Sequence, residues 1–197
     1  MAVSTERTSA NPLPKAAVAQ IRDLFMHGGG ADYVGEPVTQ LQHALQCAQL
    51  AEQAGADQAT VVAAFLHDIG HLLPGETTSD FMAEFGRMDH ETLGAIWLEQ
   101  RGFPARVTQL IRHHVNAKRY LTARYPHYLA RLSEASRQTL TYQGGPMEAD
   151  EMRTFEANPY FTQIIQVRRW DEAAKMTSHT TPGLDQYVDL VRVFLEG

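Results

Sequence analysis

His67 and Asp68 are the neighbouring residues of this 197-residue sequence whose types most clearly suggest chemistry. They follow residues 61–66, a Val-Val-Ala-Ala-Phe-Leu run that is apolar on nearly every side of a helix and therefore belongs in a protein core. A carboxylate at the end of such a helix is costly unless it is paired or bound to a metal ion. The dipeptide alone is weak evidence, because a helix-end aspartate beside a surface histidine gives the same letters.

Further histidines and an aspartate stand on helices that could meet this pair. His43 lies 24 residues before His67 on an expected helix. Further along the chain come His90 at a helix start, His114 at a helix end and Asp171 in a late helix. Imidazole and carboxylate ligands without a thiolate suit Fe, Mn, Zn or Co, whereas Ca²⁺ prefers oxygen ligands. The pattern predicts a site for two metal ions that share a bridging carboxylate.

The elements that must position these residues are predicted to be helices. Apolar residues recur at helical spacing, and no segment shows the alternation of a half-buried strand. The expected helices cover residues 14–26, 39–54, 58 to about 71, 90–101, 104 to about 115, 116–140 with a break at Pro126, 148–156, 160–175 and 184–195. Residues 72–87 form a loop or short-helix insertion. We predict an all-α single domain over residues 15–197, preceded by a flexible lead-in at residues 1–14.

Composition narrows the classes of partner. Hydrophobic residues make up 44% of the sequence and charged residues 20%, as in ordinary soluble domains. The net charge of −6 and the pI near 5.8 argue against broad binding to nucleic acid or anionic membranes, although a small anionic substrate needs only a local basic pocket. No apolar run reaches membrane-spanning length, and the start lacks a hydrophobic signal segment. A single cysteine, Cys47, excludes an intrachain disulfide and fits a cytoplasmic location.

A known family carries this combination of residues. The set His43, His67-Asp68 and Asp171 reproduces the H…HD…D signature of the HD-domain superfamily, and His90 and His114 match the extra histidines of its dinuclear members. From about residue 24 to about residue 187, the sequence resembles the mixed-valence diiron oxygenases that cleave 1-hydroxyalkylphosphonates. The segments that carry this resemblance are Asp32-Tyr-Val-Gly-Glu36, residues 40–47, residues 117–121, residues 136–139, Tyr142-Gln-Gly-Gly-Pro-Met147 and Trp170-Asp-Glu172.

The resemblance implies a metal site with a specific set of ligands. One iron ion would be held by His43, His67, Asp68 and Asp171. Asp68 would bridge to the second, which His90 and His114 would complete. Tyr33 would occupy an open iron position at rest and leave when the substrate binds. The cofactor would be a mixed-valence Fe(II)/Fe(III) pair, with no organic cofactor.

The resemblance also implies a reaction. The substrate would be a small organophosphonate, 1-hydroxy-2-aminoethylphosphonate with a free or N-methylated amine. O2 would support cleavage of its C–P bond to phosphate and glycine, or an N-methylated glycine such as glycine betaine. Glu36 would contact the amino end, and the residues around the phosphonate would be His71, Lys118, Ser136, Thr139 and Arg168. Tyr33, Glu36 and His71 are the expected catalytic side chains. An Fe(II)/2-oxoglutarate phosphonate hydroxylase would act in the preceding step.

Helical spacing bears on two of these roles. Lys118 lies four residues after His114, so a continuous helix would present a cation beside a metal ligand. The same sequence is also compatible with a solvent-exposed lysine beside Arg119. Arg168 lies three residues before Asp171, and its guanidinium fork suits an anionic tetrahedral group. A surface Asp–Arg pair has the same spacing.

His71 and Tyr33 each leave alternatives open. His71 lies four residues after His67, but Gly70 indicates that the helix is already ending, so we predict a substrate contact rather than a ligand. Tyr33 follows the glycines at 28–30 in a loop that could open and close over a substrate. It could equally pack over the core.

The C2 end of the substrate is the least defined part of the prediction. Glu36 suits an ammonium or a quaternary ammonium, and the sequence does not choose between them. A quaternary group favours aromatic walls, for which Tyr33, Tyr160 and Phe161 are candidates. Arg169, an extra basic residue before the Trp-Asp segment, has no predicted role.

Two other functions compete with the oxygenase. An HD phosphohydrolase would use the same ligands to activate water between two metal ions, so the ligands do not decide. Tyr33, Glu36 and the nearly full-length match favour the oxygenase. The third possibility, a non-catalytic binding module with a vestigial site, is disfavoured by the intact ligand set.

Overall fold

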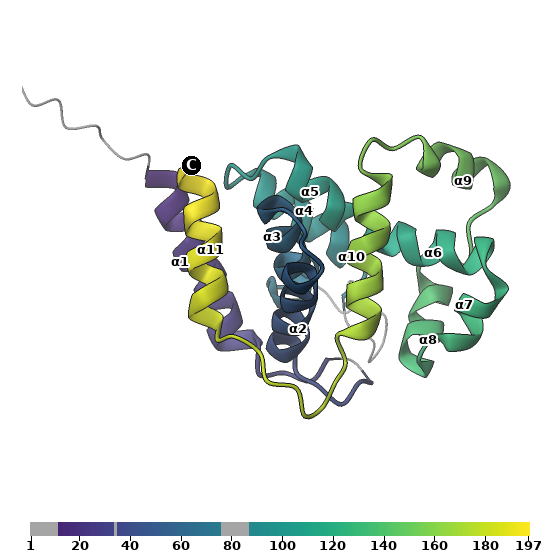
Figure 1. Cartoon of the computed structure of the whole chain (residues 1–197), viewed down its shortest axis with the longest axis horizontal. Coiled ribbons are helices and arrows are strands. Elements are labelled where there is room, and N and C mark those ends of the chain that lie inside the picture. The colour runs from purple at the N-terminus through teal and green to yellow at the C-terminus, as the bar shows by residue number, and fades with distance from the viewer. Residues whose placement is uncertain (1–11, 34, 76–86) are drawn as a thin grey trace, which may run out of the picture.

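The chain folds as a bundle of helices, seen in a computed structural model that describes residues 12–33, 35–75 and 87–197 (Figure 1). The α-helices are α1 (Pro12–Gly28), α2 (Gln40–Gln53), α3 (Gln58–Leu66), α4 (His90–Glu99), α5 (Ala105–Arg112), α6 (His114–Arg124), α7 (Pro126–Arg131), α8 (Glu134–Tyr142), α9 (Ala149–Glu156), α10 (Phe161–Ala173) and α11 (Leu184–Glu196), and a 3-10 helix, η1 (Ile69–Leu72), follows α3. Within the described ranges, strand-like pairing is limited to an isolated bridge between Asp32 and Thr39. The all-α prediction is confirmed.

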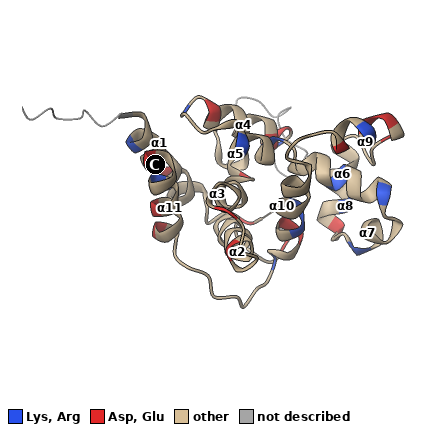
Figure 2. Ribbon diagram, turned by 45° about the horizontal axis from the view of Figure 1, so that its top comes forward, with Lys and Arg blue, Asp and Glu red and all other residues tan. Residues whose placement is uncertain are grey.

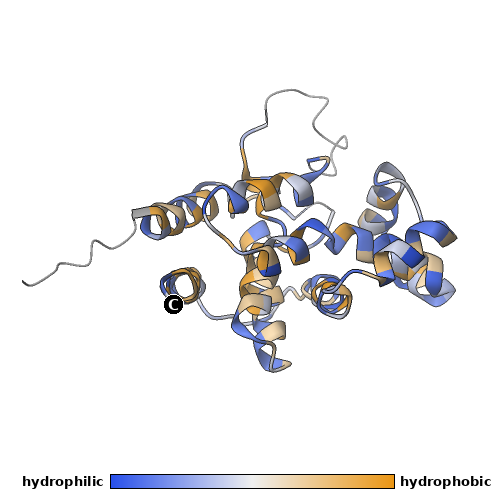
Figure 3. Ribbon diagram, turned by 90° about the horizontal axis from the view of Figure 1, so that it is seen from above, coloured by the Kyte–Doolittle hydropathy of each residue, from blue (hydrophilic) through white to orange (hydrophobic). Residues whose placement is uncertain are grey.

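Helix α3 forms the centre of the bundle. Every residue from Ala59 to Leu66 is buried, as the all-apolar run predicts. Helices α2, α5, α10 and α11 all pack against it. Hydrophobic residues run through the helices at the centre of Figure 3, whereas the group α6–α9, at the end away from the N-terminal trace, carries more hydrophilic residues. The carboxyl end of α3 therefore places His67 and Asp68 in the buried interior, where they are 0% and 7% exposed.

Two peripheral groups of helices flank this centre (Figure 1). On one side α1 packs along α11, so the first and last described helices lie together. On the other side α6 packs against α10 and leads into α7, α8 and α9. Lysine and arginine are interspersed with aspartate and glutamate over the outer helices in the view of Figure 2, as the modest net charge predicts. None of the helices in the described part of the chain is long and apolar enough to cross a membrane.

Local capping explains where the helices that carry His43 and lead to His67 begin. Asp57 caps α3 by accepting the Thr60 backbone N–H, as its position predicts. Thr39 and Gln42 form a reciprocal capping box at the start of α2. Because both starts are fixed, the face of α2 that carries His43 is held in register with the end of α3.

The boundaries differ from the sequence prediction at two informative positions. Helix α3 ends at Leu66 rather than near residue 71, and His71 lies on the separate turn η1. The predicted helix to about residue 115 breaks at His113, so His114 begins α6 instead of ending the previous helix. Residues 1–11 of the predicted lead-in and residues 76–86 of the predicted insertion lie outside the described residues.

Gly70 explains why η1 can lie so close to α4. A Cβ atom at this position would stand 1.9 Å from the backbone oxygen of His90. Only glycine permits that approach. The contact fixes the start of α4, and hence His90, against the turn that follows Asp68.

Candidate metal centre and substrate pocket

Four buried histidines surround the Asp68 carboxylate. Each belongs to a different part of the chain, and all are at most 4% exposed: His43, His67, His90 and His114. The Nε2 atoms of His43 and His67 lie 3.1 Å apart, and those of His90 and His114 lie 3.2 Å apart. The helices thus bring together as two pairs the histidines that the sequence predicted as ligands.

The two oxygens of Asp68 face different histidine pairs. Oδ2 lies 3.2 Å from His67 Nε2 and 3.5 Å from His43 Nε2. Oδ1 lies 3.3 Å from Nε2 of both His90 and His114. Asp171 adds an oxygen on the first side only, 3.4 Å from His43 Nε2. A carboxylate with one oxygen toward each pair has the arrangement that a bridging ligand requires.

The opposite nitrogen of each of these rings is already bonded to the backbone. The bonds run from His43 Nδ1 to Ala174 O (2.9 Å), His67 Nδ1 to Ala64 O (2.8 Å), His90 Nδ1 to Arg87 O (3.2 Å) and His114 Nδ1 to Ile111 O (2.7 Å). A carbonyl can only accept, so each Nδ1 carries the proton. Each Nε2 therefore faces other ring nitrogens and carboxylates. Although burial lowers the pKa of His43, His67 and His90, the carboxylates raise it above the usual value, so this arrangement attracts a cation to Nε2. Such a donor set needs cations between its members, which fits a dinuclear metal site.

Charge favours ionised carboxylates at this centre. Burial would raise the pKa of Asp68, but His67, followed by His114 and His43, holds it well below its usual value. Burial would likewise raise the pKa of Asp171, but Arg168 holds it well below its usual value. Both carboxylates therefore stay available as anionic ligands. Groups able to hold a metal ion include His43, His67 and Asp68.

His71 stands beside the second histidine pair. Its ring stacks on that of His90, with 3.9 Å between ring centroids. Its Nδ1 accepts the Arg87 backbone N–H at 3.2 Å. Burial, followed by the nearby His90, lowers the pKa of His71 well below its usual value, so the ring is neutral and its proton is on Nε2. Asp68, His71 and His90 also form a group whose ligand atoms lie within 4.8 Å of one another, close enough to surround one metal ion.

Tyr33 covers the other histidine pair. Its ring stacks on His43 at 3.8 Å between centroids, and its hydroxyl donates to Asp171 Oδ1 at 3.5 Å. Burial, followed by the charges of Asp68 and Asp171, raises the pKa of the Tyr33 phenol well above its usual value. The phenol oxygen thus lies at the carboxylates. Tyr33 does not simply pack over the apolar core.

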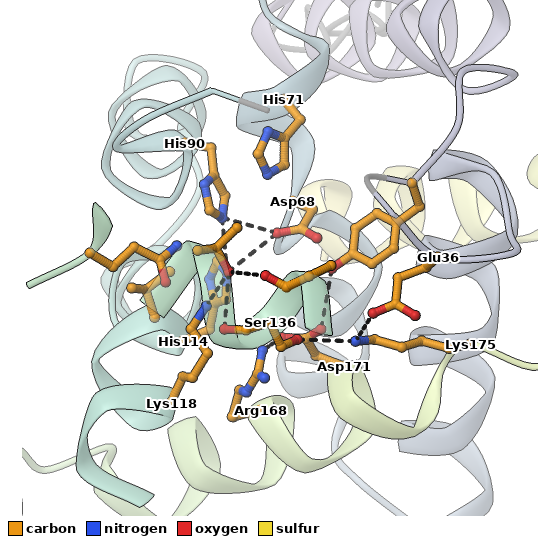
Figure 4. A pocket seen from close by; sticks show the side chains of 15 residues that line it. Glu36, Asp68, His71, His90, His114, Lys118, Ser136, Arg168, Asp171 and Lys175 are labelled. Atoms are coloured by element: carbon orange, nitrogen blue, oxygen red, sulfur yellow. Dashed lines mark hydrogen bonds and ion pairs between the residues drawn. The ribbon is translucent and has the colours of Figure 1, made fainter. Parts of the chain in front are cut away.

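A cavity opens from Asp68 toward a group of cations (Figure 4). Lys118 and Arg168 are each only 4% exposed, and both line this cavity. Helix α6 continues past His114, which brings the Lys118 amino group to within 2.9 Å of Thr139 Oγ1. Burial and then Arg168 lower the pKa of Lys118 to about 7. Two buried cationic side chains thus lie in the wall of one cavity, where they could balance the charge of an anion.

Arg168 is held by acceptors on three sides. Nη1 donates to Asp171 Oδ2 and Nη2 to Glu172 Oε2, each at 2.5 Å, and Nε donates to the Tyr128 hydroxyl at 2.9 Å. The alternative of a surface Asp–Arg pair is therefore wrong, because the pair is buried in the wall of the cavity. Its neighbour Arg169 is exposed and lines separate grooves away from this cavity.

Most of the residues predicted from sequence meet at this one cavity. Its lining includes Tyr33, Glu36, Asp68, His71, His90, His114, Lys118, Ser136, Thr139, Arg168 and Asp171. The predicted aromatic walls Tyr160 and Phe161 are wrong, because neither lines the cavity. Phe161 packs instead against Tyr120 and Phe155.

Lys175 and Gln143 also line the cavity, and sequence reasoning missed both. Lys175 lies four residues after Asp171, but α10 ends at Ala173, so a helical-face argument does not apply to it. Gln143 belongs to the Gln-Gly-Gly-Pro turn, which supported the resemblance without receiving a role. That turn was the available signal for Gln143.

Fold and cluster together define a helical metal-binding domain of the HD type. The family profile of the HD domain matches residues 41–151, and the chain belongs to that family. Three similar proteins align with nearly the whole of this chain. A protein of Leisingera caerulea, [1-hydroxy-2-(trimethylamino)ethyl]phosphonate dioxygenase (glycine-betaine-forming), is 46% identical over 180 residues, 87% of each chain. Hydroxymethylphosphonate dioxygenase of Gimesia maris is 40% identical over 188 residues, 93% of this chain and 92% of the relative. An uncharacterized protein of Acanthamoeba polyphaga mimivirus is 42% identical over 178 residues, 90% and 81% of the two chains.

Proposed function

We propose that this chain is an iron-dependent dioxygenase that cleaves the carbon–phosphorus bond of a 1-hydroxyalkylphosphonate to give phosphate and a carboxylic acid. One observation carries the proposal: the cations Lys118 and Arg168 share a cavity with Asp68, Asp171 and the second histidine pair, His90 and His114. An anionic head group bound there would lie against the candidate metal centre. The names of the Leisingera caerulea and Gimesia maris relatives support the same class of reaction.

The proposed ligands are those that the resemblance implies. One ion would be held by His43, His67, Asp68 and Asp171, and the other by Asp68, His90 and His114. The division of the Asp68 oxygens between two histidine pairs supports this assignment. A mixed-valence Fe(II)/Fe(III) pair, with no organic cofactor, would supply the one-electron and O2 chemistry that these side chains lack. The protein's task is to keep the Nε2 lone pairs and the carboxylates directed inward.

The phosphonate would be bound by side chains on α6, α8 and α10. Lys118 and Arg168 would balance its charge, and the hydroxyls of Ser136 and Thr139 would donate to its oxygens. His71 would donate through Nε2, the nitrogen that carries its proton. The C1 hydroxyl would then lie toward Asp68.

The substrate would carry nitrogen at C2. We propose a 1-hydroxy-2-aminoethylphosphonate with a free or N-methylated amine, oxidised at C1 to glycine or to an N-methylated glycine such as glycine betaine. Glu36 would accept the ammonium end. At rest Tyr33 would occupy an open iron position. It would leave this position when the substrate enters, and its ring would form an aromatic wall for a quaternary amine.

The setting of the reaction follows from the chemistry of the substrate. An Fe(II)/2-oxoglutarate phosphonate hydroxylase would install the C1 hydroxyl in the preceding step. We propose that both steps take place in the cytoplasm.

Oxygen dependence distinguishes this function from hydrolysis by the same ligands. The purified protein should contain about two iron ions and release phosphate from 1-hydroxy-2-aminoethylphosphonates only when O2 is present. Substrates that differ only in N-methylation should be compared with and without O2. Equal phosphate release in anaerobic buffer would favour an HD phosphohydrolase and refute the oxygenase.

The resting role of Tyr33 has its own test. Tyr33→Phe removes the phenol oxygen but keeps the ring that stacks on His43. The absorption spectrum of the resting iron centre should change, because a phenolate ligand is lost. An identical spectrum at the same iron content would remove Tyr33 from the coordination sphere.

A further inference from the structure

Lys175 forms an ion pair inside the cavity with the residue proposed to bind the substrate's amine. Its Nζ donates to Glu36 Oε1 at 2.7 Å (Figure 4). The lysine side chain is 13% exposed and the glutamate side chain 10% exposed. The same Glu36 oxygen also accepts the Ser133 hydroxyl at 2.5 Å. Glu36 therefore already has a cation and a hydroxyl donor of its own.

The lysine also reaches toward the proposed phosphonate end. Its Nζ lies 3.2 Å from Ser136 Oγ and 3.4 Å from Ser133 Oγ. Figure 4 shows Lys175 between Glu36 and Ser136. Lys175 comes just after α10, whereas Glu36 lies in the loop before α2, so the pair joins two segments of the cavity wall that are far apart in sequence.

This pair determines the charge that the pocket presents to the C2 end of a substrate. A carboxylate that is largely buried from solvent and has no partner is costly, and it attracts any nearby cation. With Lys175 in place, the Glu36–Lys175 pair is neutral overall. An ammonium group must displace Lys175 from Glu36, whereas a substrate without a cation leaves the pair intact.

We propose that Lys175 is a specificity-determining residue that lets the pocket accept 1-hydroxyalkylphosphonates with an uncharged or absent C2 substituent as well as those with an ammonium group. The inference rests on the proposed function. Without Lys175, the free Glu36 carboxylate would attract ammonium substrates and repel the phosphonate of substrates that bring no cation. The lysine thus widens the substrate range that Glu36 alone would restrict.

A charge-neutralising variant tests this role on two substrates. For wild type and Lys175→Met, kcat/KM for phosphate release is measured with [1-hydroxy-2-(trimethylamino)ethyl]phosphonate and with hydroxymethylphosphonate. The ratio of the first kcat/KM to the second should rise by at least about tenfold in Lys175→Met, since an unshielded charge at this distance is a strong effect. An unchanged ratio, or an equal loss with both substrates, overturns the proposal, because Lys175 would then be structural or a general phosphonate contact.

Companion variants isolate the ion pair as the cause. Glu36→Gln should move the ratio in the opposite direction, and Glu36→Gln/Lys175→Met should return it toward wild type, because the net charge at that end is again zero. Lys175→Arg keeps the charge and should keep the ratio. Lys15→Met, the same change at an exposed lysine on α1, should also leave the ratio unchanged. A shift in Lys15→Met, or no return in the double variant, contradicts the proposal.

Binding separates this inference from the proposed reaction. The dissociation constants of both phosphonates are measured by calorimetry on the iron-loaded proteins without O2, after iron content and far-UV circular dichroism are matched. If wild type releases no phosphate from either compound, the proposed function fails, whereas the ratio of dissociation constants still tests Lys175. A ratio that does not respond to Lys175→Met overturns the inference even where turnover is observed.

Discussion

At the candidate centre each of the four histidines around Asp68 carries its proton on Nδ1, so that Nε2 is the atom that could bind a metal ion. Replacing one of these histidines therefore tests metal binding. His67 is fully buried, and its Nδ1 donates to Ala64 O, so only Nε2 is free to act as a ligand. His67→Ala should therefore lose at least one of the two metal ions, as measured by elemental analysis of the purified protein. His27→Ala, at an exposed histidine on α1, is the matched control and should keep both. Unchanged metal content in His67→Ala would refute its assignment.

The proposed contact between Lys118 and the phosphonate predicts a pH dependence of substrate binding with a definite sign. Its pKa of about 7 means that the amine is charged below neutral pH and loses its charge above it. Only the charged form attracts a phosphonate, and kcat/KM reports the free enzyme. Above the pKa, kcat/KM should therefore fall by about tenfold per pH unit.

Arginine at the same position supplies the control for this pH profile. Lys118→Arg stays charged throughout this range, so its profile should lack the decline that Lys118 causes. The substrate's own ionisation affects both proteins equally and cancels in the ratio of their kcat/KM values. A ratio that stays constant through neutral pH would contradict the role of Lys118.

A site residue could be recognised from the sequence only where its neighbours along the chain form an unusual pattern. The pair His67-Asp68 could be recognised because a charged residue after an all-apolar run is unusual. Lys118 and Arg168 were ambiguous, because spacing along a helix does not reveal burial. Lys175 could not be found in this way, since it lies beyond the end of α10 and meets Glu36 from 139 residues away in sequence.

Most of the proposed metal ligands stand at helix ends rather than in helix interiors. His67 comes directly after α3, and His90 and His114 begin α4 and α6. The boundary before His114 was predicted about two residues too late, near residue 115, because the surrounding sequence holds neither glycine nor proline to mark it. The His114 ring donates to Ile111 O in the last turn of α5, an interaction that sequence periodicity does not show.

The contact between η1 and α4 allows a test of how an element controls the site. Gly70→Ala would force apart Gly70 and the His90 backbone, since the added Cβ would overlap a carbonyl oxygen that cannot rotate away. We expect a loss of about 1–3 kcal/mol in the free energy of unfolding, together with weaker metal binding as His90 shifts. Gly30→Ala is the control, because an added Cβ there meets nothing within 4 Å. Denaturant titration and iron content of both variants provide the measurement, and equal behaviour would contradict the packing role.

The fold as a whole was predictable because helical periodicity is local, and the family signature then predicted which helices meet. Pairing of α1 with α11 was not predicted, since nothing in either amphipathic pattern specifies its partner. The domain boundary at residue 15 remains a prediction. The core is built around α3, and the candidate centre lies at the carboxyl end of this buried helix.

Because the centre lies inside this core, metal binding should stabilise the entire domain. A ligand that binds only the folded state stabilises it by about 2.7 kcal/mol at one hundred times its dissociation constant. For a chain of this size, removal of the metal should lower Tm by roughly 5–10 °C. Scanning calorimetry with and without a chelator measures the shift, and added Fe(II) should reverse it. His67→Ala, already short of metal, should show a smaller shift. An equal Tm for chelated and iron-loaded wild type would mean that the cluster of imidazoles and carboxylates is satisfied without metal.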